Sequence, residues 1–452
     1  MKVCSILLAA GQGVRMHSKL PKVLHPILGK PMIWYALEAA RKAAQTRPVV
    51  VVGHGADAVE KFVGEGAQFV LQEHRLGTGH AVQQAVTVLR DQCDLVLVTY
   101  GDMPLLRSTT LEKLIIHQLK HAGVFTMLTG IAEDPRGFGR IIRDNDGKVN
   151  AIIEEAQATP NQLDIRELNL GVYCFKASWL WDALEQIPLS SKGEYYLTDL
   201  VGIAVSQDKS VMALQIEDPV EAIGVNTRVH LAEVERVMRR RINHDWMLAG
   251  VSIIDPDTTY IEPDVIIGQD TTLFPNTYLR GKTEIGEDCE IGPNSMIVDT
   301  RIGNSCKVIS SILEQTIIED EVYIGPYGHL RKGAHLASRV HMGNFGEVKD
   351  SYLGYGTKMG HFSYIGNATI GANVNIGCGT ITCNYDGKHK NPTEVGDDAF
   401  IGSDTMLVAP VKIGKGSRTG AGSVVTKDVP ENTLVVGIPA RIIRKMGDTN
   451  EV

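Results

Sequence analysis

Residues 365–377 read IGNATIGANVNIG, in which an Ile-Gly pair returns every five or six residues. The pairs continue through residues 251–436 at spacings near six or a multiple of six, beginning at Ile267, Ile285, Ile291, Ile302, Ile324, Ile365, Ile370, Ile376, Ile401 and Ile413. Each hexad supplies one strand with an inward aliphatic residue and one corner where Gly, Asn or Asp adopts positive φ. Three hexads close a triangular coil, and coils stack at about 4.8 Å. Because an antiparallel sandwich would not keep this period, the repeat predicts a parallel β-helix.

Length and composition limit the classes of protein to consider. The chain has 452 residues, which predicts two or three domains, each with its own core. The net charge is −8 and no basic run stands out, so no nucleic-acid partner is expected. The seven cysteines are odd in number and form no C-x-x-C pair, which argues against disulfides and structural zinc. Without a leader or a membrane-length apolar run, the sequence predicts a cytoplasmic protein.

Residues 1–226 alternate short apolar runs with helical patterns. The runs at residues 3–8, 49–52 and 95–98 each end near a glycine. Such runs, buried on both faces, predict a mainly parallel, Rossmann-like sheet with ligands at the carboxyl ends of its strands. Residues 227–250 keep helical spacing and end at Gly250, which predicts a linker helix whose arginine cluster forms a solvated face.

The first chemical motif is the glycine-rich turn LAAGQGVRM at residues 8–16, followed by Leu20-Pro21-Lys22. Backbone N–H groups in such a turn approach phosphates closely, and Arg15 and Lys22 would neutralise the phosphate charge. The G-x-G pattern alone fits any tight strand-to-helix turn, and the dinucleotide fingerprint G-x-G-x-x-G is not met. The whole string, ending in Pro-Lys, resembles the signature of sugar-nucleotide pyrophosphorylases, and the resemblance extends through the first 226 residues.

Further segments of the first half resemble the same family. Gln72 and the string GTGHA at residues 77–81 are similar to its uracil-recognition segment, since a buried Gln offers both a donor and an acceptor. Asp102 follows the third apolar run, where a lone Asp also fits a helix N-cap, but here the resemblance favours a metal ligand.

The resemblance also implies the roles of individual residues in the first half. Arg15 and Lys22 are expected to be catalytic, and Asp102 and Asn226 to hold Mg²⁺. The residues expected to bind UTP and the UDP-sugar are Leu8, Ala9, Ala10, Gly11, Gly13, Gln72, Gly77, Thr78, Tyr100, Gly101, Asp102, Gly139, Glu154, Asn169 and Asn226.

A second group of candidate residues lies in the repeat half, next to a break in the six-residue period. The break opens at Cys383 and lasts until Val395. Loops leave a regular solenoid at such breaks, and binding sites are usually built there. His361 precedes the break among Arg, Lys, Tyr and Asn residues, which favours a catalytic base over an ordinary surface histidine.

The order of these residues resembles the acetyltransferase half of the bacterial N-acetylglucosamine-1-phosphate uridyltransferase / glucosamine-1-phosphate N-acetyltransferase family. With the first half, this resemblance covers nearly the whole chain. It implies a left-handed β-helix, a homotrimer, and His361 as the base that deprotonates the sugar amine. The residues that it implies for glucosamine-1-phosphate are Arg331, Lys349, Tyr364, Asn375 and Lys390. Those that it implies for acetyl-CoA, in a groove between subunits, are Cys378, Asn384, Tyr385, Ser403 and Ala421.

Two details of the second site concern its chemistry. Asn384 is expected to orient the ring of His361. A covalent acetyl-cysteine route through Cys378 is disfavoured, because the family commonly has a small non-nucleophilic residue there. The chain departs from the family pattern at Lys332, Gly346, Asp350 and Gly360, and its tail lacks the common basic ending.

The sequence therefore predicts a two-domain bifunctional enzyme, with residues 1–226 for uridyl transfer, 227–250 as linker helix, and 251–452 for acetyl transfer together with the C-terminal tail. Acetyl-CoA and UTP would be its co-substrates, and its product UDP-N-acetylglucosamine would supply peptidoglycan and lipopolysaccharide synthesis. Two alternatives are a single-activity sugar nucleotidyltransferase and a non-catalytic regulatory subunit with the same domain pair. A degenerate binder would have little reason to keep the basic, acidic and histidine residues of both sites.

Overall fold

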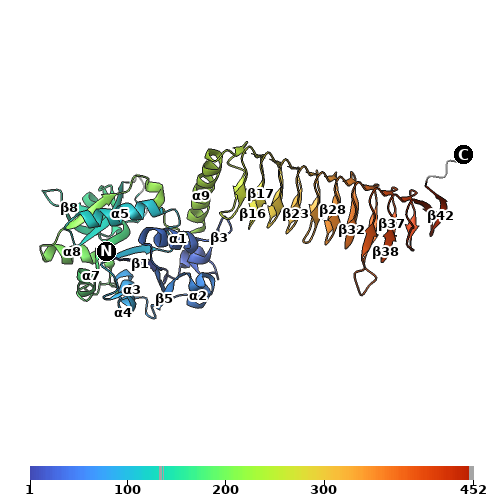
Figure 1. Cartoon of the computed structure of the whole chain (residues 1–452). Helices are drawn as coiled ribbons and strands as arrows, with labels where there is room; N and C mark the ends of the chain where they lie inside the picture. Colours follow the sequence, from blue (N-terminus) through green and yellow to red (C-terminus); the bar gives the residue numbers. More distant parts are fainter. Residues whose placement is uncertain (132–134, 136, 447–452) are drawn as a thin grey trace. The chain divides into compact units, whose positions relative to one another are not determined.

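The computed structural model describes residues 1–131, 135 and 137–446, so the end of the C-terminal tail lies outside the described residues. The chain divides into two compact units, unit 1 (Met1–Met238) and unit 2 (Arg239–Val452) (Figure 1). Within the described ranges, no helix combines the length and the apolar composition that a membrane span requires.

Unit 1 is organised around one mixed sheet. Its main path runs through β11 (Val211–Gln215), β7 (Phe125–Ile131), β10 (Glu167–Lys176), β6 (Leu95–Tyr100), β1 (Val3–Leu8), β4 (Val49–Val52) and β5 (Gln68–Leu71). β1 pairs in parallel with β4 and β6, which are the three apolar runs of the sequence. β10 runs antiparallel between β6 and β7, so the sheet is mainly but not wholly parallel. β8 (Arg140–Arg143) and β9 (Val149–Ile153) form a side ribbon attached to β10, and β2 (Pro26–Ile27) pairs with β3 (Lys30–Pro31).

Helices cover both faces of this sheet, which explains why its central strands are apolar throughout. Ile6 and Val96 belong to the core cluster that includes side chains of α3 and α7. Leu95 and Leu97, which point to the opposite face, belong to the cluster that includes α1 and α5. The helices of unit 1 before the linker are α1 (Met32–Ala44), α2 (Ala56–Val63), α3 (Thr78–Gln84), α4 (Val86–Leu89), α5 (Ser108–Lys120), α6 (Pro160–Leu163), α7 (Ala177–Leu184) and α8 (Leu200–Ser206). Its 3-10 helices are η1 (Val14–Met16), η2 (Lys22–Leu24), η3 (Gly64–Gly66), η4 (Glu155–Gln157), η5 (Leu197–Asp199) and η6 (Pro219–Ala222).

The helix expected for residues 227–250 is α9 (Arg228–Leu248), and the boundary between the two units falls within it. In unit 2, Asn243 donates its amide to the backbone oxygens of Pro256 and Thr259 at 2.8 and 3.0 Å. The prediction that the arginine cluster forms only a solvated face is wrong for Arg239. Its guanidinium lies 4.5 Å from the ring centre of Tyr260, because a cation over an aromatic face gains electrostatic stabilisation that it would not have in water.

Three sheets of short strands make up the rest of unit 2 (Figure 1). The first sheet contains β12 (Ser252–Ile253), β15 (Thr272–Leu273), β18 (Glu290–Ile291), β21 (Lys307–Val308), β24 (Tyr323–Ile324), β27 (His341–Met342), β30 (Lys358–Met359), β33 (Asn375–Ile376), β36 (Phe400–Ile401), β39 (Arg418–Thr419), β41 (Thr433–Gly437) and β42 (Ala440–Lys445). The second contains β13 (Tyr260–Ile261), β16 (Tyr278–Arg280), β19 (Met296–Val298), β22 (Ile312–Glu314), β25 (His329–Leu330), β28 (Gly346–Lys349), β31 (Ser363–Gly366), β34 (Ile381–Cys383), β37 (Met406–Val408) and β40 (Val424–Val425). The third contains β14 (Ile266–Ile267), β17 (Glu284–Ile285), β20 (Arg301–Ile302), β23 (Ile317–Ile318), β26 (His335–Leu336), β29 (Tyr352–Leu353), β32 (Ala368–Ile370), β35 (Thr393–Val395) and β38 (Val411–Ile413).

From β12 to β40, consecutive strands of the chain belong to the three sheets in turn, as the coil of a left-handed parallel β-helix requires. Strands of one sheet pair in parallel with the strand one coil further on, as Ile267 does with Ile285, whereas β42 is antiparallel to β41. The inward aliphatic residues form one continuous core, and corner residues such as Asp270 and Asn276 have positive φ. The predicted fold class is therefore confirmed. The coil between Ile370 and Val395 contains residues 384–392, which project as a loop (Figure 1).

Gly343 and Gly360 occupy equivalent corner positions on successive coils, and they differ in the space around them. A Cβ on Gly343 would lie 1.9 Å from the backbone oxygen of Gly360, whereas a Cβ on Gly360 would meet nothing within 4 Å. We expect Gly343→Ala to lower the free energy of unfolding by about 1–3 kcal/mol or more, as overpacking does. Gly360→Ala is the matched control, expected to stay within about 0.5 kcal/mol. Denaturant titration of both variants, followed by β-sheet circular dichroism, measures the difference; equal stabilities would contradict this packing.

Candidate active sites

The turn after β1 and the end of β6 meet at one edge of the sheet in unit 1. Leu8 is the register partner of Tyr100, and the N–H of Gly101 donates to the carbonyl of Leu8 at 2.9 Å. Parallel pairing thus places residues 8–13 beside residues 100–102, as expected for a ligand edge of an α/β sheet.

Three of the candidate residues converge at this edge. The ammonium of Lys22 forms an ion pair with Asp102 and donates to Oδ1 of Asn226 at 3.2 Å. The N–H of Val225 donates to the carbonyl of Asp102 at 2.9 Å, which fixes residue 226 beside residue 102. Gly13 lies against Lys22 with φ of 64°, and a Cβ there would be 2.6 Å from the Cβ of Lys22. One cation therefore already lies between the two oxygens expected to hold Mg²⁺.

Arg15 is placed differently from Lys22. It belongs to η1, its side chain is exposed, and it forms no ion pair with any residue that the structure describes. Its charge is therefore available to an external anion.

The segment expected to recognise uracil forms a hydrogen-bonded group around the buried side chain of Gln72. The Gln72 side chain is 4% exposed, and its Nε2 lies 3.0 Å from both the carbonyl oxygen of Gly77 and Nδ1 of His80. Burial lowers the pKa of His80, which favours the neutral ring. Thr78 accepts a hydrogen bond from the N–H of Leu197 at 3.0 Å. The role of His80 beside Gln72 was not anticipated, although it lies in the same GTGHA string.

The expected sugar-binding residues form a second buried group. Glu154 accepts a hydrogen bond from Thr198 at 3.3 Å, and burial raises its pKa. Burial, followed by the charges of Asp102 and Glu154, raises the pKa of Tyr100, so these residues lie within electrostatic reach of one another. Gly139 packs beside Glu154. Thr198 was not anticipated, because it lies far from Glu154 in the sequence and contacts it only in the folded chain.

The side chain of Asn169 forms hydrogen bonds within the protein. Its Nδ2 lies 2.8 Å from the hydroxyl of Tyr173, and its Oδ1 accepts from the N–H of Gly171 at 3.1 Å. Its own N–H donates to the carbonyl of Gly139 at 2.8 Å. Asn169 thereby fixes the backbone at Gly171 and at Gly139, another candidate residue.

In unit 2, four candidate residues fall into one column, namely His361, Cys378, Ser403 and Ala421. Each lies at the same corner, three residues after a strand residue of the first sheet. Those strand residues are successive register partners: Lys358, Asn375, Phe400 and Arg418. The contacts between coils agree with this alignment, since the N–H of Gly379 donates to Phe362 and that of Gly422 donates to Ser403, both at 2.8 Å. The predicted base thus lies in line with three predicted acetyl-CoA residues.

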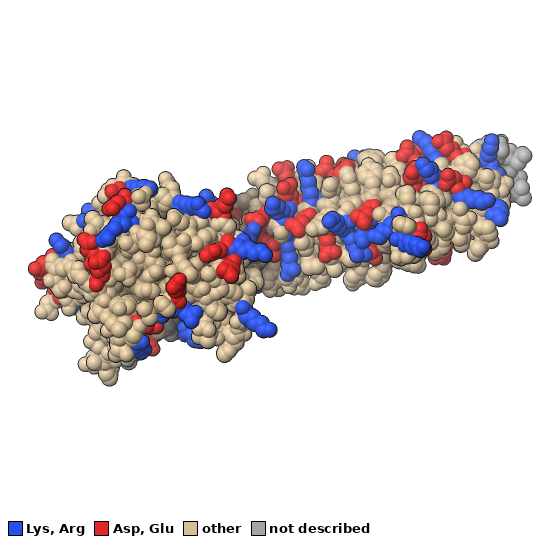
Figure 2. Space-filling model, turned by 90° about the horizontal axis from the view of Figure 1, so that it is seen from below, with Lys and Arg blue, Asp and Glu red and all other residues tan. Residues whose placement is uncertain are grey.

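Acidic and basic side chains are intermixed on the face of unit 2 seen in Figure 2. Many of them pair between neighbouring coils, as Glu290 does with Lys307 at 2.6 Å. Lys349 and Lys390 break this pattern. The neighbouring Lys390, and then Arg331, lower the pKa of Lys349, so three cations lie together. A group of cations with fewer acidic partners than positive charges is the arrangement that binds a phosphate.

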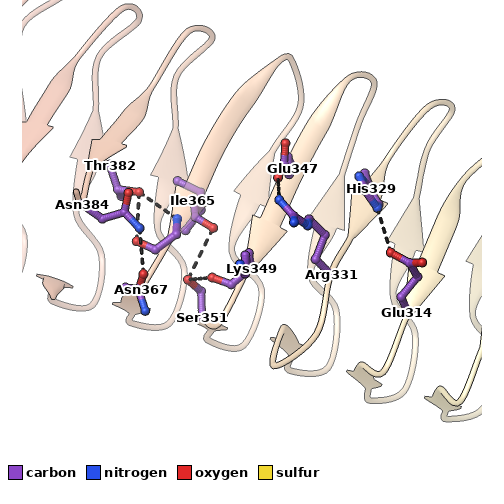
Figure 3. A network of polar contacts seen from close by, with 11 residues as sticks. Glu314, His329, Arg331, Glu347, Lys349, Ser351, Ile365, Asn367, Thr382 and Asn384 are labelled. Carbon is purple, nitrogen blue, oxygen red and sulfur yellow. Dashed lines mark hydrogen bonds and ion pairs between the residues drawn. The ribbon is translucent and has the colours of Figure 1, made fainter. Parts of the chain in front are cut away.

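A cavity of about 570 Å³ adjoins these cations. Its lining residues are Val298, Glu314, Gln315, Arg331, Lys332, Lys349 and Asp350. Arg331 donates to Oε1 of Glu347 at 2.9 Å (Figure 3), and Glu347 was not anticipated as a member of the site. Tyr364 follows Glu347 in register on the next coil.

Two of the expected arrangements are not seen among the described residues of one chain. Asn384 donates its amide to Oδ1 of Asn367 at 2.7 Å (Figure 3), and no described hydrogen bond joins it to His361. Asn375 lies on the first sheet, whereas Lys349 and Tyr364 lie on the second. Tyr385 is exposed on the projecting loop, where its hydroxyl donates to Gly387 at 2.8 Å.

Comparison with known proteins adds independent findings. Residues 5–158 match the model of the MobA-like NTP transferase domain, and residues 264–298 and 392–427 match that of the bacterial transferase hexapeptide repeats. Over 446 residues, 98% of this chain and 96% of the relative, the sequence is 48% identical to the bifunctional protein GlmU of Fervidobacterium nodosum.

Two further relatives have the same extent. The GlmU protein of Exiguobacterium sibiricum is 47% identical over 433 residues, 96% of each chain. That of Heliobacterium modesticaldum is 45% identical over 436 residues, 96% of this chain and 95% of the relative. Both halves thus match one kind of protein along almost their entire length, and the chain belongs to the GlmU family of bifunctional proteins.

Proposed function

We propose that unit 2 transfers an acetyl group from acetyl-CoA to glucosamine-1-phosphate, and that unit 1 joins the product to UMP from UTP. The second reaction releases pyrophosphate and yields UDP-N-acetylglucosamine, a precursor of cell-wall polymers. The observation that carries the proposal is that each unit presents cations beside its candidate residues: Lys22 between Asp102 and Asn226, and Lys349 beside Lys390. The predicted cytoplasmic location stays a prediction.

Uridyl transfer needs no protein nucleophile. A phosphate oxygen of the sugar attacks the α-phosphorus of UTP, and pyrophosphate leaves with the electrons of the broken bond. The protein contributes position and charge, with the backbone of residues 9–13 facing the phosphates and Arg15 and Lys22 opposing their negative charge. Gln72 offers an amide to the base, and Glu154 offers a carboxylate to the sugar.

Mg²⁺ fits the edge where Lys22 lies. A carboxylate oxygen of Asp102 and the amide oxygen of Asn226 both reach the same ammonium nitrogen, so they are near enough to share one cation. Hard oxygen ligands of this kind, few in number, suit Mg²⁺ that also binds substrate phosphates. The bound metal would neutralise phosphate charge there, and Lys22 would then be released toward the phosphates.

Removing Lys22 or Arg15 tests the first site. Lys22→Ala and Arg15→Ala should each lower kcat/KM for uridyl transfer by about 10²- to 10³-fold, since one charge aimed at a developing phosphate contributes about 2–4 kcal/mol. Acetyl transfer by the same preparations should stay unchanged. Lys19→Ala, an exposed lysine of the same loop, is the matched control. Pyrophosphate release and free-thiol release measure the two reactions, and equal losses in both would contradict the assignment.

Acetyl transfer begins with an ammonium that cannot attack a thioester until it loses a proton. His361 is exposed at the corner between β30 and β31, three residues before Tyr364. A neutral imidazole can accept that proton near pH 7, and the free amine then attacks the thioester carbonyl and expels the coenzyme thiolate. Arg331, Lys349 and Lys390 would hold the sugar phosphate, and the column through Ser403 and Ala421 would carry the pantetheine arm.

Cys378 offers a competing route, because it lies next to His361 in the same column and is partly exposed. His361→Ala should lower acetyl transfer by about 10²- to 10⁴-fold, the usual contribution of a general base. Cys378→Ala should change it less than about threefold, because no acetyl-cysteine forms in the proposed mechanism. A dead Cys378→Ala enzyme beside an active His361→Ala enzyme would reverse the assignment.

The proposed assembly is a homotrimer, and the positions of the phosphosugar residues support a site shared between copies. Asn375 lies on a different sheet from Lys349 and Tyr364, so one chain does not gather all of the predicted residues. A neighbouring copy that presents its first sheet to the second sheet of this chain would complete the group.

Co-expression of two inactive variants tests the shared site. His361→Ala and Asn375→Ala chains, each inactive alone in acetyl transfer, should regain activity when they assemble together. Random mixing leaves about one quarter of the inter-subunit sites with both residues intact, so about a quarter of wild-type activity is expected. If each chain formed its site alone, the mixed assemblies would remain as inactive as the parent variants.

A further inference from the structure

Four charged or titratable side chains lie on three successive coils beside the cation group of unit 2: Glu314 on β22, His329 and Arg331 at β25, and Glu347 on β28. In the second sheet, Ile312 pairs with His329 and His329 with Glu347, so Glu314 and Arg331 are also neighbours. Each observed contact runs diagonally from one coil to the next (Figure 3). Nε2 of His329 lies 3.2 Å from Oε2 of Glu314, and Arg331 lies 2.9 Å from Glu347.

The same register allows a second pairing of these four side chains. Alternate residues of a strand share one face, and register partners on adjacent strands lie about 4.8 Å apart. Glu347 is the direct neighbour of His329, and Glu314 is the direct neighbour of Arg331. Glu347 chiefly raises the pKa of Arg331, but the charge of Glu314 also contributes, which shows that Arg331 feels both carboxylates.

A substrate phosphate must compete for Arg331. When Arg331 turns toward a phosphate near Lys349 and Lys390, it weakens its ion pair with Glu347. A carboxylate left without a partner beside an anionic ligand would oppose binding. The charged groups that face His329 are Glu314 on β22, Arg331 on its own coil, and Glu347 and Lys349 on β28. His329 is the register partner of Glu347, so its ring is placed to receive this carboxylate.

We propose that His329, held by Glu314, is a positioning residue for the phosphosugar: it accepts the ion pair of Glu347 when the sugar phosphate draws Arg331 away. This role rests on the proposed acetyl transfer. It requires no contact between His329 and the substrate. It acts on binding rather than on the chemical step, since the proton acceptor, His361, is a separate residue.

Unit 2 contains a matched control on another sheet. Nε2 of His335 lies 2.8 Å from Oε1 of Glu319, in the same arrangement between successive coils, but on β26 and β23 of the third sheet. His335 packs edge-on against Tyr352 and is not among the residues around the cation group. His335→Gln therefore removes an equivalent ion pair from the solenoid without disturbing Arg331.

The test compares full-length wild type with His329→Gln, His329→Lys and His335→Gln in acetyl transfer. His329→Gln should raise KM for glucosamine-1-phosphate by about five- to tenfold, with kcat and KM for acetyl-CoA within about twofold. His329→Lys places a cation at the same position, so it should restore the low KM.

The possible failures are distinguishable. A wild-type chain without acetyl transfer would refute the proposed function itself. In an active enzyme, the role of His329 would be overturned by an unchanged KM in His329→Gln, by an equal rise in His335→Gln, or by a KM that stays high in His329→Lys. Uridyl transfer, assayed on the same preparations, should remain at wild-type level in all three variants.

Discussion

Stacking of one coil on the next is the constraint on which unit 2 depends. Each inward aliphatic residue packs on its register partner, and each strand binds the next coil through backbone hydrogen bonds. A slip of one residue would turn the aliphatic column outward, so the register is strongly fixed. The same register that maintains the core also aligns the outward residues into columns. His361 and Cys378, or Glu347 and Tyr364, are neighbours because the core fixes them so.

Unit 1 achieves its site by a different route. There, parallel pairing brings the ends of two strands together, and glycine allows the backbone to come close: Gly13 lies against Lys22, and Gly171 against the ring of Tyr100. The resulting arrangement pairs its own charges, because the ammonium of Lys22 lies between Asp102 and Asn226, the two residues proposed to hold Mg²⁺. Such pairing offsets the cost of holding charged groups close together at a partly buried edge.

The sequence predicted much of the fold and part of the candidate sites, and what it did not predict has physical causes. The six-residue period predicted the solenoid, and the family resemblance predicted that Asp102 and Asn226 share one site; Lys22 also lies there. The column through His361 and Ser403 was harder to predict, because residues 384–392 interrupt the count between coils. The diagonal pairs Glu314–His329 and Arg331–Glu347 depend on side-chain direction, which a repeat period does not specify. Arg239 was misjudged for a similar reason, since its aromatic partner Tyr260 lies in a different element.

The proposed phosphate site lies where the pairing of acidic and basic residues between coils is interrupted. Along much of the solenoid, a basic residue on one coil meets an acidic residue on the next, as with Glu394 and Lys412. This pairing contributes little to stability at exposed positions, but it limits repulsion within each column. At Lys349 and Lys390 the pattern gives way to like charges, which the free protein must accommodate by lowering the pKa of Lys349. A phosphate bound at the proposed site would relieve that repulsion, because its negative charge would lie among the cations. The inserted loop that carries Lys390 thus contributes one of the cations of the proposed anion site.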